Sequence, residues 1–244
     1  MPADLTSEAW LSAAVIDPEV TTLRADYRAL LIVIEGLQPG PGDEATDRLL
    51  TEAERVARAR FAETAVGDHP HVSAWQEAFR AAGMKPQRNR PSVEALLRRL
   101  DDGLPRIDRL TDVYNAISIA HVVPVGGEDL DRYQGPARLT RATGEESFDT
   151  VAKGRPIVEP PRPGEVVWRD DLGVTCRRWN WRQCARTRLT ADTARGLFIL
   201  DALGPMDDEA IERAGRALID AFRDTNPGAR ATTRLVTSAA GERV

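Results

Sequence analysis

The chain has few cysteines and no long apolar run, and each shortage excludes a class of protein. Cys176 and Cys184 are the only cysteines in 244 residues, too few for a disulfide framework and not spaced like usual zinc ligands. We expect both thiols to be reduced and structural. Apolar runs such as 29–34 and 196–203 are far shorter than the roughly 20 residues that cross a bilayer. No basic-then-apolar targeting pattern is present at the N-terminus, so we expect a soluble, cytoplasmic protein without a membrane partner.

Bulk positive charge is also missing. The formal net charge is -5 at pH 7, which disfavours a protein that holds nucleic acid through many cationic contacts. Any RNA contact must therefore be local, and we expect no DNA partner. Lys85 and Lys153 are the only lysines, so contacts with phosphate or carboxylate would come from planar arginine side chains. A GC-rich genome would produce the same bias toward arginine.

Motifs of the common nucleotide-dependent and metal-dependent enzymes are absent. The sequence has no P-loop, no Gly-x-Gly-x-x-Gly after a strand, no Gly-x-Ser-x-Gly elbow and no His-Glu-x-x-His helix. We therefore expect neither a cofactor nor a metal. His69 and His71 flank Pro70 in a polar turn, where we expect a surface position or a helix start and assign no function.

Patterns along the chain predict an α+β fold. Apolar runs within 27–37 and 196–203 predict buried strands. Helical periodicity predicts helices over about 43–61, 71–82, 93–100 with Ser92 as its cap, and 211–222. Strand-like content at 137–142, 165–169, 174–178 and 231–237 adds to the sheets, with 156–163 as a connecting loop. Because helices and strands do not alternate strictly, we expect one domain over 1–244, with mixed sheets flanked by helices and a C-terminal helix and edge strand over 205–244.

Polar residues interrupt the apolar segment from Asp112 to Val125. Asn115 and Ser118 lie three positions apart, so on a helix they share a face, and either could orient a water or a ligand hydroxyl. Capping or backbone bonding explains them equally well. His121 ends the apolar run, where a histidine without a hydrogen-bond partner would cost free energy. A satisfied core histidine is the favoured interpretation, and catalysis is the alternative.

The next segment combines glycines with carboxylates. Gly126 and Gly127 permit close approach of the backbone to a ligand, and Glu128 and Asp129 follow them. A tight turn at the rim of a pocket would have this composition. A solvated loop would have it too.

Residues 176–190 concentrate positive charge and aromatic rings. Five arginines and two tryptophans occur there without an acidic residue, a composition suited to stacking an unpaired base and holding phosphate. If the segment is a strand, alternation places Trp179 and Trp181 on one face and Arg178, Asn180 and Arg182 on the other. We favour this second interpretation, with the tryptophans in the core and the polar residues lining a pocket.

Three segments together resemble the B3/B4 domain, the editing module of the phenylalanyl-tRNA synthetase beta subunit. They are RPSVEALLRRL at 90–100, LTDVYNAISI at 110–119 and RRWNWR at 177–182. The chain resembles free-standing proteins built on that domain more closely, over about 27–204. The resemblance implies an α+β fold with a pocket that receives the 3′ end of a mischarged tRNA and hydrolyses its aminoacyl ester.

The match has departures. Asn115 and Pro124 stand at the family's asparagine and proline positions, but Gly126 stands where the family has a histidine. A histidine-dependent role is therefore not carried over, and His121 is not the equivalent residue. Residues 179–182 replace a glycine-rich segment of the synthetase pocket, which implies a different amino-acid preference.

Our hypothesis is a free-standing trans-editing factor that hydrolyses the ester of mischarged aminoacyl-tRNA, with tRNA as its partner. The alternatives are a non-catalytic module that binds RNA, an amino acid or a peptide, and a small-molecule esterase that needs no tRNA. Positioning of the attacking water would supply much of the rate, and a base would be used only if the ester requires one. The expected catalytic residues are Asn115, Ser118, His121, Glu128 and Asp129. The expected substrate contacts are Gly126, Gly127, Asn180, Arg182 and Thr187, and the expected RNA contacts are Lys85, Arg88, Arg90, Arg177, Arg178 and Arg186.

Overall fold

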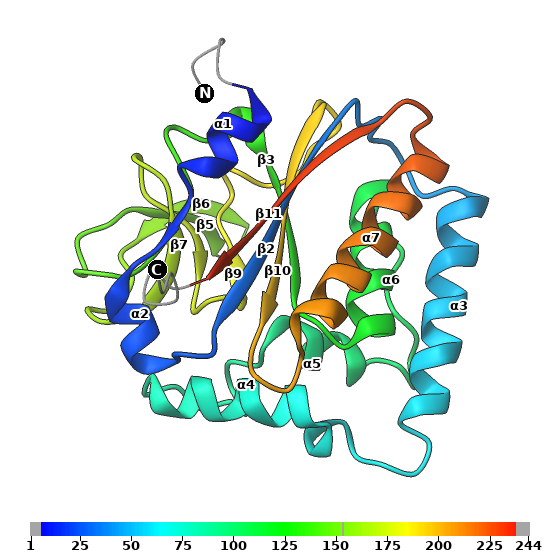
Figure 1. Ribbon diagram of the computed structural model, residues 1–244, viewed down its shortest axis with the longest axis horizontal. Coiled ribbons are helices and arrows are strands. Elements are labelled where there is room, and N and C mark those ends of the chain that lie inside the picture. The colour runs from blue at the N-terminus through cyan, green and yellow to red at the C-terminus, as the bar shows by residue number, and fades with distance from the viewer. Residues whose placement is uncertain (1–5, 153, 238–244) are drawn as a thin grey trace.

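Two β-sheets enclose one core, and helices cover the outer face of one sheet (Figure 1). The computed structural model describes residues 6–152 and 154–237. The first sheet has the order β11-β2-β10-β3, with all neighbours antiparallel. Its strands are β2 (Arg28–Glu35), β3 (Val125–Asp129), β10 (Arg195–Ala202) and β11 (Arg230–Thr237).

The second sheet has the order β1-β4-β7-β8-β9, in which only β1 and β4 are parallel. Its strands are β1 (Val15–Ile16), β4 (Arg138–Arg141), β7 (Val166–Arg169), β8 (Val174–Arg177) and β9 (Arg182–Gln183). A separate hairpin pairs β5 (Phe148–Ala152) with β6 (Arg155–Glu159).

Three long helices lie on the side of the first sheet that faces away from the second sheet (Figure 1). They are α3 (Glu44–Arg60), α6 (Arg109–His121) and α7 (Asp208–Thr225). The other helices are α1 (Ser7–Ser12), α2 (Pro18–Leu23), α4 (Pro70–Ala81) and α5 (Ser92–Leu97).

The predicted α+β class is confirmed. No helix within the described ranges is both long and apolar enough to span a membrane.

The central strands β2 and β10 form where they do because both faces of each are apolar. Leu31 of β2 and Ile199 of β10 point into the core between the sheets, while Ile32 and Phe198 point toward α6 and α7. Each such side chain contributes roughly 2 kcal/mol by leaving water. A strand that is buried on both sides shows no polar alternation, so a polar residue within it is exceptional.

Asp201 is such an exception. It shares the inter-sheet face of β10 with Ile199, since the two residues are two positions apart. The register pairs Gly126 of β3 with Ile199, and Glu128 with Leu197, so Glu128 also points between the sheets. The alternation of two neighbouring strands therefore brings two carboxyl groups into an apolar layer.

The predicted strands and helices near 27–37, 43–61, 71–82, 196–203, 211–222 and 231–237 are confirmed, and β11 is an edge strand as predicted. Several local predictions are wrong. The connecting loop predicted from Pro156 contains strand β6, because β5 supplies a partner for it. The turn predicted at 126–129 is strand β3. Ser92 does not cap α5, which has Pro91 at its N-cap position, and α1, α2 and β1 were not predicted.

The segment after Cys176 is a turn and not a continuous strand. Arg178 and Trp179 have positive φ values of 53° and 57°, which end the strand alternation. Trp179 is buried in the core as expected, but Trp181 is only partly buried and lines the same cavity as Asn180 and Arg182. The predicted division of this segment into two faces is therefore wrong.

His71 lies at the start of α4, as one of the two predicted alternatives has it, but it is buried and not at the surface. Its Nδ1 lies 2.8 Å from the carbonyl oxygen of Val122, and its Nε2 accepts a hydrogen bond of 3.2 Å from the amide of Leu203. The ring therefore joins α4 to the end of α6 and to the end of β10. Both bonds require the neutral ring with its proton on Nδ1, and burial lowers the pKa of His71 to about 4.

This burial predicts a dependence of stability on pH. An unfolded histidine binds a proton near pH 6.5, whereas folded His71 does so only near pH 4. As the pH falls, the unfolded chain therefore binds a proton at His71 before the folded protein does. This difference should lower the free energy of unfolding by up to about 3 kcal/mol between pH 7 and pH 4. Urea denaturation of His71→Gln should show a shallower pH dependence than the wild type. Gln87→Ala, at an exposed residue that does not titrate, is the control. Equal slopes for wild type and His71→Gln would contradict the assignment.

Candidate functional site

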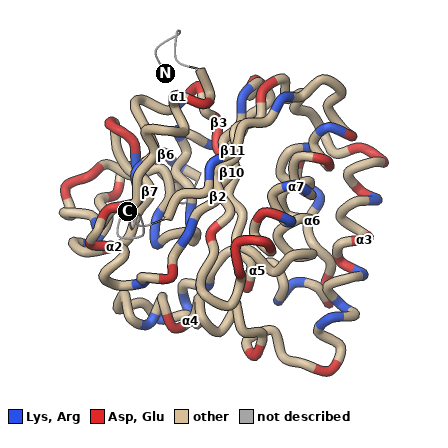
Figure 2. Tube along the Cα trace, in the orientation of Figure 1, with Lys and Arg blue, Asp and Glu red and all other residues tan. Residues whose placement is uncertain are grey.

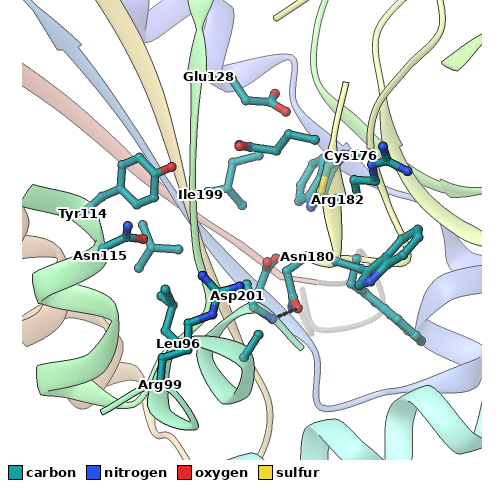
Figure 3. Close-up of a pocket in the computed structure, with 18 residues that line it drawn as sticks. Leu96, Arg99, Tyr114, Asn115, Glu128, Cys176, Asn180, Arg182, Ile199 and Asp201 are labelled. Carbon is teal, nitrogen blue, oxygen red and sulfur yellow. Dashed lines mark hydrogen bonds between the residues drawn. The ribbon is translucent and has the colours of Figure 1, made fainter. Parts of the chain in front are cut away.

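A cavity of about 260 Å³ lies where the edge strand β3 approaches the turn between β8 and β9 (Figure 3). Helices α5 and α6 and strand β10 complete its wall. Apolar and aromatic residues make up slightly more than half of the wall, and the rest of it is polar or charged. The lining residues are Ser92, Ala95, Leu96, Arg99, Tyr114, Asn115, Val125, Gly126, Glu128, Trp168, Cys176, Trp179, Asn180, Trp181, Arg182, Gln183, Ile199 and Asp201.

The asparagine-bearing helix and the tryptophan-arginine turn line this one cavity. Asn115 reaches it from α6, and Asn180 reaches it from the turn (Figure 3). Asn180 also accepts a hydrogen bond of 3.3 Å from the backbone amide of Ser92 at the start of α5. The three resembling segments, far apart in the chain, therefore meet at one place.

Gly126 allows the two sheets to approach at the cavity. A Cβ atom there would lie 3.1 Å from Nε2 of Gln183. That nitrogen donates a hydrogen bond of 2.9 Å to the carbonyl oxygen of Gly127 and so joins β9 to β3. A larger residue at 126 would push this link apart. The close backbone approach predicted for the glycine pair is therefore, at Gly126, an approach to the other sheet. Gly127 lies outside the cavity lining, and a Cβ atom there would lie 2.9 Å from the Phe198 ring and 3.0 Å from Tyr114.

Glu128 is a buried carboxyl group with one oxygen that has no protein partner. The Tyr133 hydroxyl donates a hydrogen bond to Oε2, whereas Oε1 has no hydrogen-bond partner among the described residues. Burial raises the pKa of Glu128 to about 7, against the opposing effects of the Tyr133 hydrogen bond and of the nearby Thr175 hydroxyl, which lies outside normal hydrogen-bond geometry. A carboxyl group of this kind changes protonation near neutral pH, as a general acid or base requires.

Asp201 is a second buried carboxyl group in the cavity wall, and it is not among the site residues that the sequence predicts. Tyr27 donates a hydrogen bond to it, and Asn180 and Trp168 lie close enough to favour its charged form. Burial outweighs these contacts and raises the pKa of Asp201 to about 7. The amide nitrogen of Asn180 and the indole nitrogen of Trp168 nevertheless lie outside normal hydrogen-bond geometry. Asp201 therefore attracts these two donor groups but forms a hydrogen bond with neither of them. The acidic residue inside an apolar strand was the available sequence signal.

Polar atoms without partners gather around this cavity. Of the ten buried side-chain atoms without a hydrogen bond among the described residues, half belong to its lining. Such atoms are costly and uncommon in folded proteins. Their concentration indicates a site that binds a ligand with both donors and acceptors. The atoms are Ser92 Oγ, Glu128 Oε1, Trp168 Nε1, Trp179 Nε1 and Asn180 Nδ2.

Other residues expected at the site lie outside the cavity lining. Ser118 donates a hydrogen bond of 2.6 Å to the carbonyl oxygen of Val123 and so closes the end of α6. Asp129 accepts hydrogen bonds from the Asp131 amide and the Thr193 hydroxyl. Thr187 is buried, with its hydroxyl 3.2 Å from Sγ of Cys184. His121 ends α6 and is only partly buried.

The expected RNA-binding arginines divide into two groups. Arg177 donates to both oxygens of buried Glu165 at 2.6 and 2.9 Å, and Arg186 holds Asp170 at 2.8 Å. These ion pairs occupy both guanidinium groups, of which that of Arg177 is buried and that of Arg186 is partly exposed. Arg178 pairs with Glu165 at 3.3 Å and stacks 4.2 Å from the centre of the Trp181 ring.

The positive groups near the cavity mouth are exposed. Lys85 and Arg88 are exposed and Arg90 is half-exposed, in the loop before α5. Arg99 and Arg182 are exposed and also line the cavity. Elsewhere both signs of charge are interspersed, as along α3 and α7 (Figure 2).

The described residues contain no cluster of three or more His, Cys, Asp or Glu that could hold a metal ion. Both cysteines are free and buried.

The burial of Glu128 predicts that this residue lowers stability at high pH. Its folded pKa of about 7 lies above the ordinary value of 4.5, so the unfolded chain releases the proton first as the pH rises. Glu128→Gln should therefore raise the free energy of unfolding at pH 8 by up to about 3 kcal/mol and change it little at pH 4.5. Asp129→Asn, at a carboxylate with two hydrogen-bond donors, should lower stability in the same urea titrations. A loss of stability in Glu128→Gln at pH 8 would show that the carboxylate is well solvated.

One comparison with known proteins, that with family models, agrees with the resemblance found in the sequence. No curated protein matches the chain. Among solved structures, the chain is similar to an N-terminal fragment of the phenylalanyl-tRNA synthetase beta-subunit from Pyrococcus horikoshii, with 12% identity and a TM-score of 0.49 over 93% of this chain and 52% of that one. The chain thus spans about half the length of that fragment. A family model described as the B3/4 domain matches residues 74–239, a span that starts later than the one we expected and also includes α7 and β11. The chain therefore belongs to the B3/4 domain family.

Proposed function

We propose that the chain is a free-standing editing factor that hydrolyses the ester bond of mischarged aminoacyl-tRNA in trans. The observation that carries the proposal is the unpartnered Oε1 of Glu128, on a carboxyl group with a pKa near 7, in a cavity with several unpartnered donors. Membership of the B3/4 family supports a substrate related to tRNA. The cavity volume of about 260 Å³ excludes the tRNA body and suits the aminoacylated terminal residue of its 3′ end.

In the mechanism that we propose, Glu128 acts as the base. Its carboxylate takes a proton from a water held with the help of Asn115, and the water oxygen attacks the carbonyl carbon of the ester. The tetrahedral intermediate carries its negative charge on the former carbonyl oxygen. Collapse breaks the bond to the ribose oxygen, which leaves with the proton from Glu128. The amino acid leaves with a carboxyl group, which releases its proton to solvent and becomes a carboxylate. No other reactant is needed.

The donors around the cavity suit the negative charge of the intermediate. Asn180 Nδ2 and Trp168 Nε1 are buried and lack partners, so an oxyanion would provide the hydrogen bond that the folded protein does not. Preorganised donors in a cavity that excludes water are usually the largest single contribution to such catalysis. Asp201 would orient both groups, because it attracts them from within the wall. Ser118, Asp129 and His121 have no part in this mechanism.

The assignment of Glu128 predicts a pH dependence of the reaction. Because the base must be ionised, the single-turnover rate of deacylation should rise with pH and level off above about 7. Glu128→Gln should lower the rate by about 100-fold or more and remove this dependence. Glu212→Gln, at an exposed residue of α7, is the matched control. Rates are corrected for spontaneous hydrolysis, and a Glu128→Gln enzyme with wild-type rates would exclude this base.

The two asparagines predict separate losses across a panel of mischarged tRNAs. Asn180→Ala removes an oxyanion donor and should lower the deacylation rate by about 100-fold. Asn115→Ala should lower the rate less, because a water can be held by other groups. Undiminished activity in both variants would discard the assignment. Binding of tRNA without any loss of ester would favour the non-catalytic module, and cleavage of free amino-acid esters would favour a small-molecule esterase.

A further inference from the structure

A second, basic cavity adjoins the first across the turn after β8. It has a volume of about 170 Å³. Its wall includes three arginines, Arg141, Arg162 and Arg178, together with Gly83 and Met84 at the end of α4. Nothing in the proposed mechanism uses these residues. Arg141 and Arg162 did not stand out in the sequence, because they are 21 positions apart and lie in different motifs.

The charge of this second cavity is positive on balance. Its one carboxylate, Glu165, is already held by Arg177 at 2.6 Å and by Arg178 at 3.3 Å. Neither Arg141 nor Arg162 forms an ion pair with a carboxylate of residues 6–152 or 154–237. Burial and the neighbouring positive charges of Arg177 and Arg162 lower the pKa of Arg178. An anion bound among these groups would relieve their repulsion.

Two chain segments connect the basic cavity to the first one. The turn begins with Arg178, which lines the basic cavity, and continues through Trp181, which lines the first. The loop before α5 does the same, from Met84 at the basic cavity to Ser92 at the first. This loop carries the exposed cations Lys85, Arg88 and Arg90. The stack of Arg178 on Trp181, at 4.2 Å, lies on the boundary between the two cavities.

We propose that the basic cavity binds a phosphate group of a single-stranded RNA 3′ end whose terminal residue occupies the first cavity. The inference rests on the proposed function, and it adds Arg141 and Arg162 as phosphate-binding residues. Arginine forks match phosphate oxygens in a bidentate geometry. The exposed cations between the cavities would contact the backbone, which explains how a chain of net charge -5 holds RNA locally.

The test measures binding of short RNAs of increasing length that share one 3′ end. The probes are adenosine and 5′-fluorescein-labelled CA, CCA and ACCA, with fluorescence polarisation for the labelled RNAs and calorimetry for adenosine. In the wild type, affinity should rise by about tenfold at the length whose phosphate first reaches the basic cavity. Arg141→Gln with Arg162→Gln should lose this step and keep the affinity for shorter probes. The slope of the logarithm of the binding constant against the logarithm of the salt concentration should also become shallower in this variant, by about 0.7 for each lost phosphate contact.

Control variants separate a charge effect from a folding defect. Arg162→Gln alone changes an exposed side chain and should lose part of the same step, even if Arg141→Gln unfolds the protein. Arg141→Lys with Arg162→Lys should retain the salt slope, because it keeps the charge. Arg216→Gln, on the far side of the first sheet on α7, should bind like the wild type.

The outcomes distinguish this inference from the proposed function. If the wild type binds the longer RNAs with the expected step but releases no amino acid from tRNA, the phosphate site stands and the hydrolase proposal fails. If the double variant keeps both the step and the salt slope, the phosphate site is overturned whatever the deacylase activity is. Tighter binding of a phosphoserine peptide than of ACCA would also overturn the assignment to RNA.

Discussion

Glu128 and Asp201 lie buried between two sheets that are otherwise joined by apolar side chains, and their burial constrains the rest of the site. An ionised carboxylate in such a layer costs several kcal/mol unless donors surround it. The fold supplies Tyr133 to Glu128, and Tyr27 to Asp201. Because these donors only partly offset burial, both pKa values rise to about 7.

The parts of the fold that the sequence predicts are those set by local patterns. Strands β2 and β10 and helices α3 and α7 follow from runs and periodicities of apolar residues. The failures occur where a distant partner decides the structure. Strand β6 contains Pro156 and forms because β5 pairs with it. His71 is internal because Val122 and Leu203 supply its two hydrogen bonds. These partners lie 51 and 132 positions away in the chain, so no local pattern could indicate them.

The candidate site was predictable to a similar degree. Polar atoms within apolar surroundings pointed to Asn115, and the density of arginine and tryptophan pointed to Asn180 and Arg182. Glu128 was named beside Asp129, but composition could not tell which carboxylate faces the cavity, because adjacent strand residues point to opposite faces. The register with β10 makes that choice. Asp201 is not predicted, because the apolar run around it indicates only a buried strand. An acidic residue in such a strand is nevertheless an exception of the kind that indicates a functional site.

Arginine is used for two different purposes around the cavity, and burial separates them. Arg177 and Arg186 stabilise the second sheet and its neighbouring loops through Glu165 and Asp170, so the density of arginine in this segment exceeds the number of cations that a ligand could reach. The cations left for a ligand lie on the loop before α5, at the cavity rim and in the adjoining basic cavity. A few exposed arginines beside an aromatic cavity suit the end of a single strand, since stacking and local charge contacts bind such an end without a basic surface. The acidic balance of the whole chain is therefore compatible with an RNA ligand.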